Sequence, residues 1–166
     1  MSTVRVMTEA DVTAVSEIRV TGWKVAYAGI VPRSYLDRMT VEADAHQRRQ
    51  YVTKPDKATV DLVAVDARGA VTGWACFGPS RTAAGELYAL YVRPSLIGSG
   101  IGRTLLGAVH ANAAALGFGS VLLWVLTDNT GARRFYERAG YVADGAVQTD
   151  DYDGVSLTEV RYRLAL

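Results

Sequence analysis

A glycine-rich segment between a predicted strand and a predicted helix carries the clearest chemical signal in the chain. The strand is predicted over Glu86–Val92 and the helix over Gly100–Leu116. The glycines of the segment are Gly98, Gly100 and Gly102. Because glycine has no Cβ, the N–H groups of such a segment can point into one concavity and let a pyrophosphate approach. The helix N-terminus adds free N–H donors, and Arg103 in its first turn adds a positive charge. The pattern predicts a site for a nucleotide-like diphosphate.

The glycine spacing also decides between rival phosphate loops. A tight strand–helix turn that binds nothing remains open on this pattern alone. A Walker loop is excluded because no Gly-Lys-Ser/Thr follows. A dinucleotide-binding loop has the pattern G-x-G-x-x-G, and Arg103 stands where its last glycine is required. The sequence therefore disfavours a nicotinamide-dependent oxidoreductase.

A second segment, DNTGARRFYERAGY, occupies Asp128–Tyr141. Asn129 is a favourable N-cap for a short helix predicted over Thr130–Ala139. We interpret Phe135 as core packing. The neighbouring Tyr136 gains a chemical meaning only when this segment is considered together with the glycine-rich one.

Together the two segments resemble the GNAT superfamily of acetyl-CoA-dependent N-acetyltransferases. The first string is LYVRPSLIGSGIGRTLL at Leu90–Leu106, and the second is NTGARRFYERAGY at Asn129–Tyr141. Both stand in the family's order and at its spacing. A third string, WKVAYAGIVP at Trp23–Pro32, looks like a common acetyltransferase subgroup whose first helices line the acceptor site. The resemblance covers nearly the whole chain.

The resemblance implies where the acetyl donor binds. In the family, the strands corresponding to Glu86–Val92 and Ser120–Leu126 splay apart and admit the pantetheine arm of acetyl-CoA. A backbone N–H near Leu90 is implied to polarise the thioester carbonyl. The implied cofactor-binding residues are Leu90, Tyr91, Val92, Gly98, Ser99, Gly100, Ile101, Gly102, Arg103 and Asn129.

This chain departs from the family at one loop position. Many members carry Gln or Arg where this chain has Ile97. A side-chain contact to the pyrophosphate is lost there, while the backbone N–H contacts remain. Arg93 and Arg103 are candidates for compensating the loss.

The implied reaction needs an acid and a base. A lysine-like amine has a pKa of about 10.4 and must lose a proton to attack, and the leaving thiolate must gain one. Tyr136 matches the family's general acid. Glu86 is the candidate base, with a solvated strand-end carboxylate as the equal alternative. Trp23 and Tyr27, four residues apart on one helix face, are candidate acceptor-binding residues, with plain core packing equally open.

The order of predicted elements is β-α-α-β-β-β-α-β-α-β-β. This order predicts one α/β domain over residues 1–166, in which a mixed sheet has helices on both faces. The predicted helices run from Thr8 to about Ala28 and over Arg33–Met39, Glu42–Val52, Gly100–Leu116 and Thr130–Ala139. The predicted strands are a short one at Val4–Val6, then Thr59–Asp66, Val71–Gly78, Glu86–Val92, Ser120–Leu126, Tyr141–Gln148 and Val155–Leu164.

Composition bounds the partners. The net charge of +1 gives no bulk field for nucleic acid or an anionic membrane. The single cysteine Cys76 and the distant His46 and His110 disfavour a metal site. The chain shows no signal-peptide core and no membrane-spanning run, so we expect a cytoplasmic protein.

Three functions are weighed for this sequence. The first is an N-acetyltransferase acting on an amine of a small molecule, peptide or protein. A non-catalytic acyl-CoA-binding sensor is the alternative, and Tyr136 argues against it because a sensor needs no leaving-group acid. The nicotinamide-dependent oxidoreductase comes last. The exposed final strands make a homodimer plausible.

Overall fold

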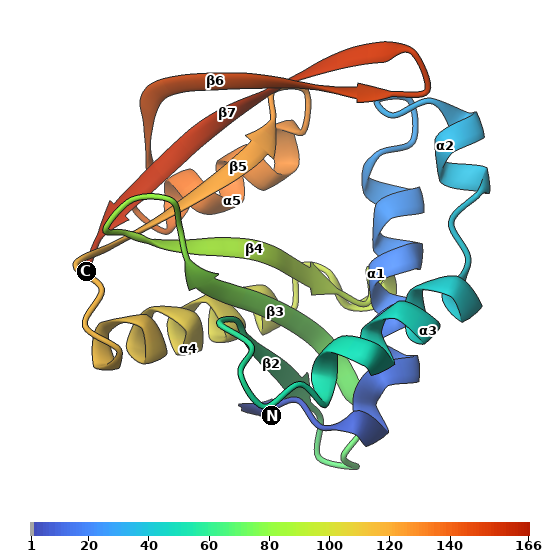
Figure 1. The fold of residues 1–166 in the computed structure, drawn as a ribbon, viewed down its shortest axis with the longest axis vertical. Helices are drawn as coiled ribbons and strands as arrows, with labels where there is room; N and C mark the ends of the chain where they lie inside the picture. The colour runs from blue at the N-terminus through green and yellow to red at the C-terminus, as the bar shows by residue number, and fades with distance from the viewer. Residues whose placement is uncertain (1) are drawn as a thin grey trace.

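Seven strands form one mixed sheet in the order β1-β2-β3-β4-β5-β7-β6 (Figure 1). The structure is a computed structural model that describes residues 2–166. The strands are β1 (Thr3–Val6), β2 (Val60–Val65), β3 (Val71–Pro79), β4 (Gly85–Val92), β5 (Ser120–Leu126), β6 (Val142–Tyr152) and β7 (Val155–Ala165). Neighbouring strands pair antiparallel except β4 and β5, which are parallel. The predicted mixed sheet is confirmed.

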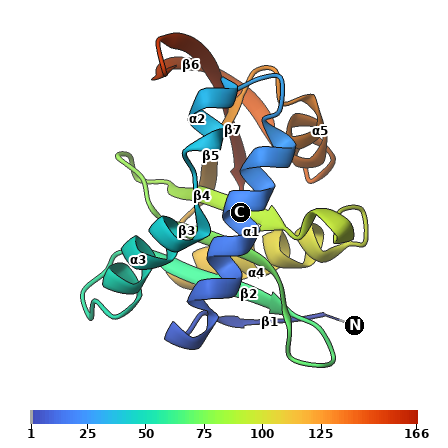
Figure 2. The same ribbon diagram turned by 90° about the vertical axis from the view of Figure 1, so that its right-hand side faces the viewer.

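Helices cover both faces of this sheet (Figure 2). One face carries α1 (Val12–Ala26), α2 (Arg33–Asp37) and α3 (Val41–Val52), and the other carries α4 (Ile101–Ala115) and α5 (Thr130–Arg138). Single 3-10 turns stand at Glu9–Asp11 and Pro94–Leu96. Three helices therefore lie between β1 and β2, as the three predicted helical ranges have them, although the predicted element order counts only two there.

Each face of the sheet has its own core, as β2 shows. Leu62 and Ala64 belong to the cluster that includes Val109 of α4. Val63 and Val65 alternate with them and pack with Ile18 of α1. Because successive side chains on a strand point to opposite faces, this alternation buries β2 on both sides.

The last two strands form a long hairpin that is tied to α2. Asp153 and Gly154 make the turn, with φ angles of 53° and 83°. The Asp153 carboxylate accepts hydrogen bonds from Arg38 Nη1 at 2.7 Å and from Ser34 Oγ at 2.7 Å. These contacts hold α2 against the hairpin tip. The homodimer remains a prediction, for which β6 supplies a free outer edge at the end of the sheet.

Candidate active site

The parallel pairing between β4 and β5 ends almost as soon as it begins. The two strands pair only at Gly85 with Val121 and at Glu86 with Leu122. Beyond this point the edge of β4 that faces β5 has no strand partner. The register between β3 and β4 also shifts, so that Tyr88 stands unpaired in a bulge. A bulge bends its strand and increases the local twist, which turns β4 away from β5. The predicted splay of the central strands is present, as a V-shaped opening that we call the V.

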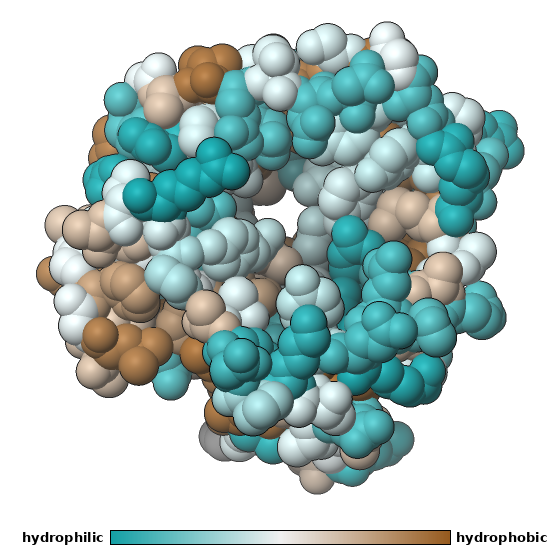
Figure 3. Space-filling view, viewed as in Figure 1, coloured by the Kyte–Doolittle hydropathy of each residue, from teal (hydrophilic) through white to brown (hydrophobic). Residues whose placement is uncertain are grey.

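The V corresponds to a hollow in the molecular surface. Figure 3 shows the molecule open near its centre, in the view where β4, β5 and α1 surround that point in Figure 1. Two further surface pockets lie beside the V. The larger, of about 610 Å³, is lined by the end of α1, the loop into α2, and Val155 of β7. The smaller, of about 240 Å³, lies between the ends of β5 and β7.

A row of free N–H groups lies at the start of α4. Gly98 and Gly100 have φ angles of 88° and 92°, a left-handed conformation that favours glycine. In residues 2–166, no protein acceptor pairs with the N–H groups of Gly98, Gly100, Ile101, Gly102 or Arg103. Because these unpaired donors lie together at a helix N-terminus, they form a cradle of N–H groups of the kind that suits an anion. That this loop binds phosphate stays a prediction.

Gly102 has a different role from the other two glycines. A Cβ at this position would lie 3.3 Å from two ring atoms of Phe135. Gly102 therefore allows α5 to pack closely against α4. Phe135 itself is half-buried against the main core, whereas Tyr136 is the buried member of the pair.

The loop arginines differ in their availability. Arg93 Nε donates to the carbonyl of Val71 at 2.8 Å, and Arg93 also faces Glu17. It is therefore a structural residue that joins β4 to β3 and α1. Arg103 is exposed and makes no ion pair within the described residues, and Ile97 is 67% exposed beside the cradle. Arg103, rather than Arg93, is free to contact a phosphate.

Tyr136 contributes a buried phenol from α5. Its ring packs edge-on against Phe135 at 5.2 Å and Tyr141 at 5.7 Å between centroids. Burial raises the pKa of the Tyr136 hydroxyl well above its ordinary value, and the neighbouring Tyr141 and Tyr27 add to the shift. The phenol consequently keeps its proton at neutral pH. The hydroxyl has no hydrogen-bond partner in the part of the chain that the structure describes, so it is free to donate to a ligand.

Aromatic side chains of α1 and β4 meet on the opposite side of the V. The Tyr27 and Tyr91 hydroxyl oxygens are 3.5 Å apart, and Asn129, whose side chain caps α5, lies near the Tyr27 hydroxyl. Trp23 packs edge-on against Tyr27 at 4.7 Å. Trp23 and Tyr27 also belong to the apolar cluster around Tyr152. The two side chains therefore pack a core, and their role in binding the acceptor stays a prediction.

Glu86 stands at the vertex of the V, as the last β4 residue that pairs with β5. Partial burial raises the pKa of its carboxyl, while the charges of Arg81 and Arg161 act in the opposite direction. Arg161 and Glu159 of β7 were not predicted as site residues. They lie on the same face of the sheet as Glu86. Alternation along Val155–Leu164 places these two residues on one face, but only the insertion of β7 between β5 and β6 brings them beside the V.

The described residues 2–166 hold neither a metal-binding cluster nor a membrane-spanning helix. No group of three or more His, Cys, Asp or Glu side chains is arranged to hold a metal ion. Across the same residues, none of the helices has the length and apolar character needed to span a bilayer.

Comparison with known proteins places the chain in a family. A model of the acetyltransferase (GNAT) family matches residues 25–141, more than half of the chain. A Bacillus subtilis protein named Uncharacterized N-acetyltransferase YuaI is 31% identical over 133 residues, which cover 78% of this chain and 74% of that protein. Probable N-acetyltransferase Rv2775 of Mycobacterium tuberculosis is 27% identical over 165 residues, covering 97% of this chain and 92% of that protein.

A solved structure shares the whole fold. The PaiA N-acetyltransferase of Thermoplasma acidophilum, crystallised with coenzyme A, superposes with a TM-score of 0.81 at 19% identity, covering 100% of this chain and 99% of that one. The family match and this fold agree with the V and the N–H cradle. The chain therefore belongs to the GNAT family of acetyltransferases, whose acetyl donor is acetyl-CoA.

Proposed function

We propose that this protein transfers the acetyl group of acetyl-CoA to a primary amine by direct attack, with Tyr136 as the general acid. The observation that carries the proposal is the combination of three features along the two central strands and the helices that follow them. The unpaired edge belongs to β4, the N–H cradle stands at the start of α4, which follows β4 in the chain, and the buried phenol of Tyr136 lies on α5, which follows β5.

The residues present fit the acetyl donor. The cradle at Gly98–Arg103 supplies N–H donors for the pyrophosphate, and Arg103 supplies a charge. The free edge of β4 over Leu90, Tyr91 and Val92 can pair with the pantetheine amides as an added strand. Asn129 stands across the V from that edge. When bound, acetyl-CoA supplies the thioester carbonyl that the amine attacks.

The chain's own groups divide the chemistry. A β4 backbone N–H donates to the carbonyl oxygen as negative charge develops there, which is worth about 2.7–4 kcal/mol. Glu86 accepts the amine proton, directly or through a water, as the nitrogen–carbon bond forms. The Tyr136 hydroxyl donates its proton to the sulfur as the carbon–sulfur bond breaks. Trp23 and Tyr27 line the side from which the amine enters.

Gly100→Asp is expected to abolish acetyl-CoA binding, because it strains a φ of 92° and places a negative charge in the cradle. Thermal denaturation and calorimetry measure the effect. The wild type gains about 2.7 kcal/mol of stability at 100 times Kd, and NAD gives much less. Gly107→Ala, at an open helical position on α4, is the control that keeps binding. Equal stabilisation by NAD and acetyl-CoA contradicts the assignment.

Tyr136→Phe is expected to lower kcat by about 10²-fold or more while the Kd for acetyl-CoA stays nearly constant. The loss falls on kcat because the proton is needed only as the thioester breaks. Tyr141→Phe is the matched control, since it removes a buried phenol hydroxyl that bonds to His110 at 2.7 Å. That control loses stability and keeps kcat. An unchanged kcat for Tyr136→Phe, where chemistry limits the rate, assigns the acid elsewhere.

Glu86→Gln tests the base through the pH profile. Because burial raises the Glu86 pKa, the folded state favours its protonated form, and the stability that this adds is lost as pH rises through the folded pKa. The neutral Gln is therefore expected to keep or slightly raise the stability at pH 7. In the pH profile of kcat/KM, the rise that follows deprotonation of Glu86 is expected to disappear. Glu159→Gln, whose carboxylate accepts from Gln148 on the same face, is the control. A profile unchanged by Glu86→Gln removes Glu86 from the base role.

A further inference from the structure

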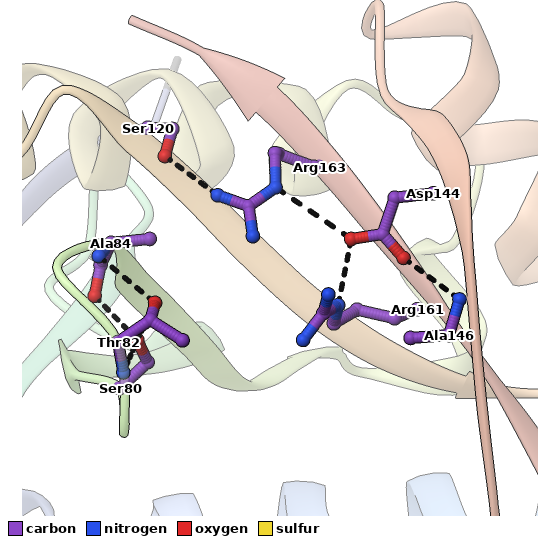
Figure 4. Close-up of polar contacts among 8 residues, drawn as sticks. All are labelled: Ser80, Thr82, Ala84, Ser120, Asp144, Ala146, Arg161 and Arg163. Atoms are coloured by element: carbon purple, nitrogen blue, oxygen red, sulfur yellow. Dashed lines mark hydrogen bonds and ion pairs between the residues drawn. The ribbon is translucent and has the colours of Figure 1, made fainter.

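The irregular part of β6 is built around one arginine of β7. Ala143 pairs with Tyr162 and Val147 with Val160, so three β6 residues stand opposite Arg161 alone. Asp144 begins this bulge, and its carboxylate accepts from the backbone N–H of Ala146 at 3.1 Å and from Arg161 Nε at 2.7 Å. Figure 4 shows these contacts on one face of β7. Bulges of this kind re-aim a side chain, and this one fixes the direction of Arg161.

The outer nitrogens of Arg161 have no protein partner. A guanidinium carries five N–H donors, of which Asp144 occupies the one on Nε. No acceptor in the described residues pairs with either Nη, although the side chain is only 25% exposed. The guanidinium lies over Trp124 of β5, 5.6 Å from the ring centroid. Arg161 is thus a largely buried cation that Asp144 holds through Nε, and its two Nη groups are free to bind a ligand together.

Arg163 is a close neighbour that is engaged differently. Its Nη1 donates to Ser120 Oγ at 3.1 Å, and its Nε faces Asp144 at 3.6 Å (Figure 4). The positive charge of Arg161 lowers the pKa of the Glu86 carboxyl. Arg81, in the turn before β4, also faces Glu86 and makes no ion pair in residues 2–166.

The position of Arg161 assigns it to the acceptor and not to the acetyl donor. Val160, Tyr162 and Leu164 alternate with it and pack on the α4 and α5 side. Arg161 therefore projects from the face opposite the cradle, the face that carries Trp23 and Tyr27. Glu86 pairs with Leu122, and Trp124 pairs with Arg161. With strands about 4.8 Å apart and about 3.4 Å per residue, the Cα atoms of Glu86 and Arg161 are separated by roughly 12 Å. Because both side chains project from the same face of the sheet, side by side and not toward each other, a ligand of a few atoms can lie between their charged ends.

We propose that Arg161 binds a carboxylate of the acceptor, so that the substrates are primary amines that carry a carboxylate a few bonds from the nitrogen. The free Nη groups of Arg161 pair with both carboxylate oxygens, a geometry that a guanidinium fork favours. Glu86 supplies the negative charge on the amine side. This inference rests on the proposed acetyl transfer and specifies its acceptor.

Matched acceptors test the charge requirement. Thiol release is measured for amino acids against the corresponding amides and decarboxylated amines, for example leucine, leucinamide and isoamylamine, at equal concentrations of neutral amine. We expect kcat/KM to be about 10- to 150-fold higher for the carboxylated member, the value of a charge-assisted hydrogen-bonded pair. Arg161→Gln should reduce this ratio toward one, mainly by raising KM for the carboxylated member.

Arg163→Gln is the matched control, because it removes the neighbouring arginine of the same strand face and should keep the ratio. Circular dichroism and acetyl-CoA binding establish that both variants are folded. The inference is overturned if the wild type acetylates amino acids, amides and decarboxylated amines with equal kcat/KM. It is also overturned if the kcat/KM ratio of Arg161→Gln equals that of the wild type. Both results leave the proposed acetyl transfer standing. Binding of acetyl-CoA without thiol release for any amine overturns the proposed function and the inference together.

Discussion

The site depends on the early end of the parallel pairing between β4 and β5. β5 is held along its whole length by β7, from Ser120 opposite Ala165 to Leu126 opposite Glu159. β4 is bent by its bulge at Tyr88 and follows β3 instead. The two central strands of one sheet therefore diverge, and the β4 edge is left with backbone groups that need partners. Because unpaired buried backbone groups are costly, this edge favours a ligand that carries amides of its own.

In the reaction that we propose, the two faces of the sheet beside the V recognise different substrates. Backbone N–H groups at the start of α4 bind the acetyl donor there, and they need no particular side chain. Charged and aromatic side chains of α1 and β7 bind the acceptor in the same proposal. Glu86 stands where the two faces meet. The donor face thus follows from glycine positions and helix geometry, whereas the acceptor face depends on individual residues such as Arg161 and on the Asp144 bulge that aims it.

Local signals in the sequence predicted most of the helices and strands, whereas the pairing of strands far apart in the sequence could not be predicted. The β5 strand Ser120–Leu126 matches its predicted bounds because it is a short apolar run, and Asn129 caps α5 as expected. The glycine-rich turn before α4 was predictable because positive φ angles favour glycine. The insertion of β7 beside β5 was not predictable from alternation, so Glu159 and Arg161 were missed. Gly102 was assigned to the pyrophosphate, whereas its contact with Phe135 depends on how α5 packs on α4.

Hydrogen exchange of the β4 amides, with and without acetyl-CoA, tests the central claim most directly. If the V admits the pantetheine arm, the exposed amides within Leu87–Val92 gain protection when the donor is bound, because they acquire hydrogen-bond partners. Amides of β2 and β3, which are already paired, change little. Binding of acetyl-CoA that protects the cradle at Gly98–Arg103 and leaves the β4 amides unchanged contradicts the account.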